Sequence, residues 1–262
     1  MITKAKYHPR SVEKAKEVEN QLITKLKSDK LPSLTVWNWL KFGDDVHQAL
    51  SSGKVTIFAK YVSSRGSVLK QLNAKYGEAN VAAALATAQG NRATQDIASA
   101  LQQKQLSTWL SKGESLGKVF GFLKFRESDG LPQKLDTLYE YLKLFKTKNH
   151  QDGTTVFKVL RKGFGDDDDQ LVLMLSRALR APGSRPMEST ITRYQNLVFK
   201  EWVTRDLDPM SVAVKVFKIP EANVGAAKYN GEIKSIIKQY SSFFKRETGL
   251  GMGPEVVRSG RV

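Results

Sequence analysis

Three histidines are the side chains of this sequence best suited to act as general bases near neutral pH. His8 and His47 fall in segments of helical composition, and His150 falls in the polar segment KTKNHQDG at 146–153. None of them stands at the spacing of a known catalytic motif. The chain has no cysteine, so a thiolate nucleophile is excluded as well. We therefore predict no catalytic residue and expect that the protein is not an enzyme.

Two segments contain residue types that bind metals or nucleotides in other proteins. The run Asp166 to Asp169 is acidic but lacks the alternating ligand spacing and final glutamate of a calcium loop. We interpret it as acids that complement a helix dipole and cap free N–H groups. The segment GLGMG at 249–253 follows no strand, so it does not match a dinucleotide-binding motif. We predict no metal site and no cofactor.

The composition is that of a globular protein with a basic surface. Of its 262 residues 40% are apolar, which suffices for a substantial core. The 42 Lys and Arg against 26 Asp and Glu give a net charge of +16, which attracts polyanions or acidic protein surfaces. The sequence contains no run of 18 apolar residues and no apolar signal core near its start. We expect neither membrane insertion nor a signal peptide in the sequence as given.

Apolar residues recur at helical spacing along the chain, most clearly between Gln105 and Phe145. Two amphipathic helices are predicted there, joined by the turn ESDGLP at 127–132. Similar helices are predicted before and after this segment, and strand-type alternation extends over no long segment. The predicted fold class is therefore all-α.

The chain repeats its own pattern, with loops of variable length between the repeated residues. A tryptophan follows a leucine or tyrosine by eight residues three times, and later in each unit an apolar residue stands three positions before a tyrosine. An aromatic–glycine–acid triplet precedes an apolar helix in two copies, at Tyr76 and Phe164. The repeated residues are Trp39, Trp109 and Trp202; Phe58 with Tyr61, Leu138 with Tyr141 and Ile237 with Tyr240; and Tyr76 and Phe164.

This order of residues resembles the tandem WY and LWY repeats of oomycete RxLR effectors. The resemblance covers residues 31–244 and rests on QLSTWLSKGESLGKVFGFLKF, KLDTLYEYLKLF and VLRKGFGDDDDQLVLMLSRAL. The chain departs from the family pattern where the W-motif tryptophan is expected, since Phe58, Leu138 and Ile237 stand there. The Y-motif tyrosine is kept as Tyr76 and replaced by Phe164 in the second copy. The RxLR and acidic translocation signals do not occur in the sequence.

The resemblance implies small helical bundles stacked into an elongated rod, each closing the core of its neighbour. Trp39, Trp109 and Trp202 would then be buried at the joints. The implied division is a charged lead-in helix at 1–30, a first WY-like unit at 31–100, a second LWY unit at 101–193, a third, truncated LW unit at 194–248, and a flexible tail at 249–262.

The resemblance also implies a function. Such a protein would be secreted by a pathogen and act in the host plant cell, in the cytoplasm or the nucleus, as a non-enzymatic protein-binding module that suppresses immunity. Its partner would be a host protein, and a host serine/threonine phosphatase scaffold is one candidate. The alternative is a basic nucleic-acid-binding protein or a suppressor of RNA silencing. The partner-binding residues and the oligomeric state stay open.

A short peptide motif offers one further alternative. The segment YEYL, Tyr139 to Leu142, fits the loose aromatic-x-x-aliphatic form of autophagy-receptor peptides, which bind by adding a strand to a sheet edge. The same residues belong to the apolar stripe of a predicted helix, and we interpret them as helix core.

Overall fold

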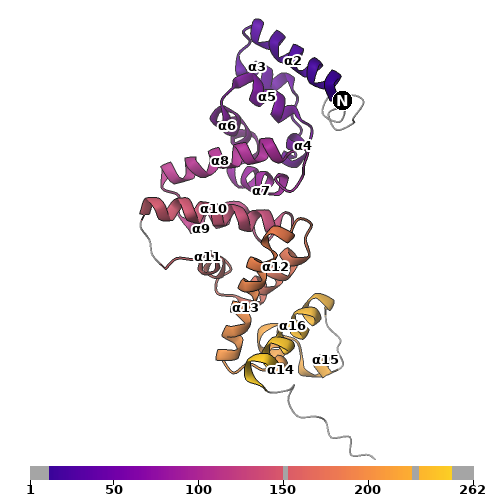
Figure 1. Cartoon of the computed structure of the whole chain (residues 1–262), viewed down its shortest axis with the longest axis vertical. Coiled ribbons are helices and arrows are strands. Elements are labelled where there is room, and N and C mark those ends of the chain that lie inside the picture. The colour runs from indigo at the N-terminus through magenta and orange to yellow at the C-terminus, as the bar shows by residue number, and fades with distance from the viewer. Residues whose placement is uncertain (1–11, 150–152, 226–229, 250–262) are drawn as a thin grey trace, which may run out of the picture. The chain divides into compact units, whose positions relative to one another are not determined.

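The computed structural model describes residues 12–149, 153–225 and 230–249, and the regular structure in these residues is helical throughout (Figure 1). The prediction of an all-α fold is confirmed. The chain divides into two compact units, unit 1 at Met1–Val156 and unit 2 at Phe157–Val262. His8, His150 and the tail after Gly249 lie outside the described residues.

Unit 1 is a succession of short and long helices, and capping side chains mark the starts of some of them. Ser115 Oγ, for example, accepts the backbone N–H of Lys118 at 3.2 Å at the start of α9. The helices are α2 (Val12–Ser28), α3 (Ser33–Trp39), α4 (Val46–Ser51), α5 (Lys54–Val62), α6 (Arg65–Tyr76), α7 (Glu78–Ala88), α8 (Gln95–Lys112), α9 (Leu116–Leu123) and α10 (Leu131–Asn149).

Helix α7 lies at the centre of unit 1 and contacts α4, α6, α8, α9 and α10. Its residues Val81 to Ala86 are buried at every position, so the helix is apolar on all sides. The small alanine side chains let the neighbouring backbones come close. At Gly130, which has a φ of +62°, an added Cβ would lie 2.4 Å from Thr87 Oγ1 of α7. A glycine is therefore required where the loop before α10 meets α7.

Unit 2 packs α12, α13 and α16 against one another. Its core contains the side chains of Ile191, Phe199, Trp202, Ile236 and Tyr240. The helices are α11 (Val156–Gly163), α12 (Asp168–Arg180), the 3₁₀ helix η1 (Arg185–Met187), α13 (Glu188–Thr204), α14 (Pro209–Ser211), the π-helix η2 (Val212–Val216), α15 (Glu221–Gly225) and α16 (Gly231–Thr248).

The structure corrects the prediction that Trp39 is a buried joint residue. Trp39, at the end of α3, is 61% exposed, whereas Trp37 is 7% exposed. The Trp37 ring stacks on Phe42 at a centroid distance of 4.0 Å and meets the edge of Phe58 at 5.1 Å. Two residues along an α-helix are about 200° apart around the axis, so Trp37 and Trp39 cannot both face the core.

Candidate functional site

Three predicted repeat tyrosines make the same contact. Each donates its hydroxyl to a backbone carbonyl in the loop that follows a long helix, namely α2, α8 or α13. For Tyr141 the distance to the acceptor is 2.6 Å. Burial, followed by the nearby Glu114 or Asp208 charge, raises the pKa of Tyr141 and of Tyr240 to about 12. The donor–acceptor pairs are Tyr61 and Leu31, Tyr141 and Glu114, and Tyr240 and Leu207.

The apolar residues three positions before these tyrosines are all buried. Phe58 and Leu138 are fully buried, and Ile237 is nearly so. They face the same core as the tyrosines, as the spacing of three residues on a helix requires. Tyr76 and Phe164 are buried as well, and the Tyr76 hydroxyl donates to Gly43 O at 2.7 Å.

The tyrosine contacts also indicate which residues correspond to one another in the three copies of the repeat. Counting back five residues from each acceptor carbonyl leads to Trp109 in α8, Trp202 in α13 and Leu26 in α2, and all three side chains are buried. Leu26 thus occupies the position that the sequence analysis gave to Trp39. The eight-residue spacing from Leu31 to Trp39 pointed to the wrong residue. It selects Trp39 in α3, whereas the helix that corresponds to α8 and α13 is α2, which precedes Leu31.

The two buried tryptophans share a polar contact that sequence reasoning missed. Trp109 Nε1–H donates to Glu78 Oε1 at 2.8 Å, and Trp202 Nε1–H donates to Asp168 Oδ2 at 3.0 Å. Both acids are the first residue of a helix, α7 and α12. The sequence signal that could have found them is an acid at a helix start 31 or 34 residues before a tryptophan.

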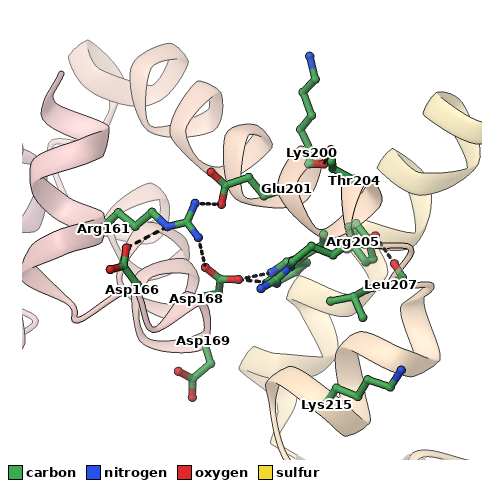
Figure 2. A network of polar contacts seen from close by, with 12 residues as sticks. Arg161, Asp166, Asp168, Asp169, Lys200, Glu201, Thr204, Arg205, Leu207 and Lys215 are labelled. Carbon is green, nitrogen blue, oxygen red and sulfur yellow. Dashed lines mark hydrogen bonds and ion pairs between the residues drawn. The ribbon is translucent and has the colours of Figure 1, made fainter. Parts of the chain in front are cut away.

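In unit 2 this contact extends into a network of charges around Asp168, which is 7% exposed (Figure 2). Arg205 Nη2 donates to Asp168 Oδ2 at 2.6 Å, and Arg161 Nη2 lies 3.7 Å from Asp168 Oδ1. Arg161 also pairs with Asp166 at 3.2 Å and with Glu201 of α13. Burial raises the pKa of Glu201, and the Arg161 charge opposes that shift. The network links α11, α13 and the loop that precedes α12.

The acidic run therefore does more than favour a helix start. Asp168 and Asp169 lie in the first turn of α12, where they complement its dipole, but the N-cap Asp167 makes no side-chain capping bond. The acid of the run that accepts a backbone N–H is Asp169, whose Oδ1 accepts from Gln170 N at 2.6 Å. Among the described residues the structure contains no group of three or more His, Asp or Glu side chains that could hold a metal ion.

Asp169 makes the stability that the start of α12 contributes depend on pH. Burial, followed by a hydrogen bond and repulsion from Asp167, raises the pKa of Asp169 from 3.8 to about 6. The folded state therefore binds a proton that the unfolded state has released between pH 3.8 and about 6. The stabilisation from this group is complete below pH 3.8 and is lost as the pH rises through about 6.

We expect Asp169→Asn to raise the melting temperature at pH 7 and to have no effect at pH 3.5 or below, because the variant removes a partly buried charge that Asp167 repels. Thermal melts of both proteins at several pH values measure this. The control is Asp96→Asn, the same substitution at an exposed acid in the first turn of α8. An equal gain at every pH would show that the change acts through something other than this charge.

His47 is the predicted histidine that the structure describes. It lines a surface pocket of about 530 Å³ together with Asp44, Asp45 and Tyr76. The Tyr76 hydroxyl is already bonded to Gly43 O, and burial followed by the charges of Asp44 and Asp45 raises its pKa. The pocket thus brings His47 close to acids and to a phenol that acts as a hydrogen-bond donor.

A buried lysine is a further residue that sequence reasoning missed. Lys134 in α10 is 1% exposed, and its Nζ donates to Lys124 O at 3.1 Å and Glu127 O at 3.2 Å. Burial lowers the pKa of Lys134, and the charges of Glu127 and Asp129 oppose that shift. The ammonium group satisfies two carbonyls at the end of α9 and the following turn, which is a structural role.

The exposed apolar side chains are the surface features most relevant to binding. On α3, Leu34 is 55% exposed, and Trp39 is exposed as well. On α10, Tyr139 and Leu144 are exposed, while Tyr141 and Leu142 of the YEYL segment are buried in the helix. A strand-adding peptide would require this part of α10 to unfold. In the part of the chain that the structure describes, no helix is long and apolar enough to span a membrane.

No family model matches the chain. An RxLR effector protein of Phytophthora infestans is 28% identical over 256 residues, covering 92% of this chain and 35% of the relative. RxLR effector protein PSR2 of Phytophthora sojae is 30% identical over 224 residues, covering 80% of this chain and 32% of the relative. The chain thus spans about a third of the length of these relatives. Among solved structures, the crystal structure of PcRxLR12 matches with a TM-score of 0.61 at 20% identity, over 95% of this chain and 57% of that one.

Proposed function

The chain belongs to the oomycete RxLR effectors, and from this membership we propose that it acts inside the host plant cell as a non-enzymatic protein-binding module that suppresses immunity. It would be secreted by the pathogen and act in the cytoplasm or the nucleus. The host partner we propose is a scaffold of a serine/threonine phosphatase, which the effector would recruit.

The observation that carries this proposal is how the repeated aromatic residues are used. Their hydroxyl and indole groups are bonded to the protein itself, at Leu31, Glu114, Leu207, Glu78 and Asp168. These side chains hold helices together and leave the exposed side chains to bind partners. Leu34 and Trp39 are of the apolar and aromatic types that dominate protein interfaces.

We propose that the repeats begin with the long helices α2, α8 and α13, so that the first repeat includes residues assigned above to a lead-in helix. The shared tyrosine contact supports this division. In this division the second repeat begins with α8 at Gln95 and the third with α13 at Glu188. The predicted starts at 101 and 194 fall inside these two helices, so they move to the helix starts.

The test is a pull-down from plant-cell extract with the purified chain, a nuclease treatment and a moderate-salt wash. We expect a host protein at about equal amount to the bait, together with serine/threonine phosphatase activity in the eluate. The matched variant is Trp39→Ser, which we expect to lose the partner and keep its melting temperature. A host protein without phosphatase activity would contradict the phosphatase proposal and leave protein binding standing.

The alternative, nucleic-acid binding, is favoured by the net charge of +16. Binding driven by phosphate contacts falls about 10³-fold or more between 50 and 200 mM salt when six or more phosphates are contacted. Loss of all bound material on nuclease or salt treatment would therefore favour this alternative and contradict the protein-binding proposal.

A further inference from the structure

A groove between α8 and α10 has the features of a binding site that the repeated contacts do not explain. It has a volume of about 490 Å³ and lies within unit 1. We call it the α8–α10 groove. The lining residues that matter for its chemistry are Gln102, Leu106, Asp136, Thr137, Glu140 and Leu144.

One of the residues that line the groove, Gln102, has a buried side-chain oxygen without a hydrogen-bond partner among the described residues. Gln102 is 3% exposed, and its Nε2–H donates to Oε1 of Gln105, which is 2% exposed, at 2.9 Å. Gln102 Oε1 and Gln105 Nε2 have no hydrogen-bond partner among the described residues. Exchanging O and N in both amides still leaves one acceptor and one donor unpaired. Because buried polar groups in proteins are nearly always bonded, the Gln102 carboxamide is suited to a ligand.

The rim of the groove is acidic, in contrast to the net positive charge of the chain. Asp136 and Glu140 lie one turn apart on α10, and no lysine or arginine lines the groove. Lys143 Nζ donates to both carboxylate oxygens of Glu140, at 3.1 and 3.2 Å. Asp136 forms no ion pair among the described residues. Burial, followed by the Glu140 charge, raises the pKa of Asp136, and the more distant Lys143 charge opposes that shift. A cation bound beside Asp136 would compensate that carboxylate.

The groove also has an apolar part. Leu106 is buried and Leu144 is exposed, and both line the groove. An arginine side chain fits this combination, because its methylene stem packs on apolar groups while its planar guanidinium presents five N–H donors. These donors can reach a carboxylate and a carboxamide oxygen together, which the compact ammonium of lysine does less well.

We propose that the α8–α10 groove binds an arginine side chain of a protein partner, with Asp136 and Gln102 Oε1 as the acceptors. The inference rests on the proposed function, because it names the chemistry of one partner contact. The exposed edge of the groove, at Leu144, offers apolar surface to the residues that flank the arginine.

The experiment is a titration of the full chain with N-acetyl-arginine amide, followed by NMR of backbone amides and glutamine side-chain amides. We expect saturable shifts of the Gln102 side-chain amide and of the Thr137 backbone amide. N-acetyl-citrulline amide, which has the same shape without the charge, should cause no saturable shift. Equal shifts with both probes, or shifts confined to residues outside the groove, would overturn the proposal.

Two variants test the acceptors. Asp136→Asn should weaken binding of the arginine probe at least fivefold, and Asp206→Asn, the same substitution on an exposed residue of unit 2, should leave it unchanged. Gln102→Met, which keeps the length of the side chain, should weaken binding at least threefold, so the proposal does not depend on one variant. Unchanged affinity in both groove variants would overturn it.

The titration with the arginine probe and the pull-down test different claims, so one can give a negative result without the other. The arginine probe requires no host protein, so binding of the probe without capture of a host protein would uphold the groove and contradict the proposed function. Capture of a host protein with equal strength by wild type and Asp136→Asn, together with no binding of the probe, would contradict the groove alone.

Discussion

Trp109→Ala is expected to lower the free energy of unfolding of unit 1 by about 3 to 5 kcal/mol, the range for removing a large aromatic side chain from a core. The Trp109 side chain is fully buried, stacks on Phe122 at a centroid distance of 5.2 Å and meets the edge of Tyr141 at 6.0 Å. The substitution also removes the indole donor of Glu78, whose carboxylate is then left without that hydrogen bond. Urea unfolding followed by circular dichroism measures the change.

The matched control is Trp39→Ala, the same substitution at the exposed tryptophan. We expect a change within about 0.5 kcal/mol there, as for surface positions in general. An unfolding curve of Trp109→Ala that coincides with that of wild type would contradict both the predicted position of Trp109 at a joint and the repeat register. A large loss in Trp39→Ala would mean that its side chain is covered in solution.

Asp168→Ala is expected to lower the free energy of unfolding of unit 2 by about 2 to 4 kcal/mol, as for removing one partner of a buried charge network. The variant leaves Trp202 Nε1 without its acceptor and removes the carboxylate between Arg161 and Arg205 (Figure 2). The side chains of Arg161 and Arg205 are 30% and 48% exposed, so water compensates part of the loss. Thermal and urea unfolding of the two proteins side by side provide the measurement.

Two further variants show whether the loss of stability in Asp168→Ala comes from the charge network, from the hydrogen bond to Trp202 or from the helix dipole. Asp168→Asn keeps an oxygen acceptor for the indole and removes the charge, so it should lose less than Asp168→Ala. Asp167→Ala alters an exposed acid that caps no N–H group and that repels Asp169, so it should cause no loss of stability. Equal losses in Asp167→Ala and Asp168→Ala would show that the effect comes from the helix dipole and not from the network.

Much of the fold could be predicted from the sequence because helix formation depends on residues three and four positions apart. The stripe Leu116, Val119, Phe120 and Leu123 is the buried face of α9. The pairs ending in Tyr61, Tyr141 and Tyr240 face the core because their apolar partner stands three residues earlier on the same helix. The glycine and proline of ESDGLP likewise separate α9 from α10, as their backbone preferences require.

The contacts of the candidate sites could not be predicted as well from the sequence, because the side chains that bond to one another come from distant parts of the chain. Nothing local to Trp109 selects Glu78 among the acids of the sequence, and nothing local to Asp168 selects Arg205 over the other cations. Nothing local to Gln102 and Gln105 distinguishes them from surface glutamines, and both are buried in α8, against which α10 packs. Such contacts depend on which helix faces which neighbour.

The sequence by itself therefore determined the helices, their apolar faces and the repeat of apolar residue and tyrosine, since these follow from local spacing. Only the tertiary structure decided between Trp37 and Trp39, because α3 has an aromatic residue on each of two opposite faces and just one face can pack on Phe42 and Phe58. It also decided that Leu26 corresponds to Trp109 and Trp202, since that equivalence depends on the carbonyl that each tyrosine reaches 27 to 33 residues away.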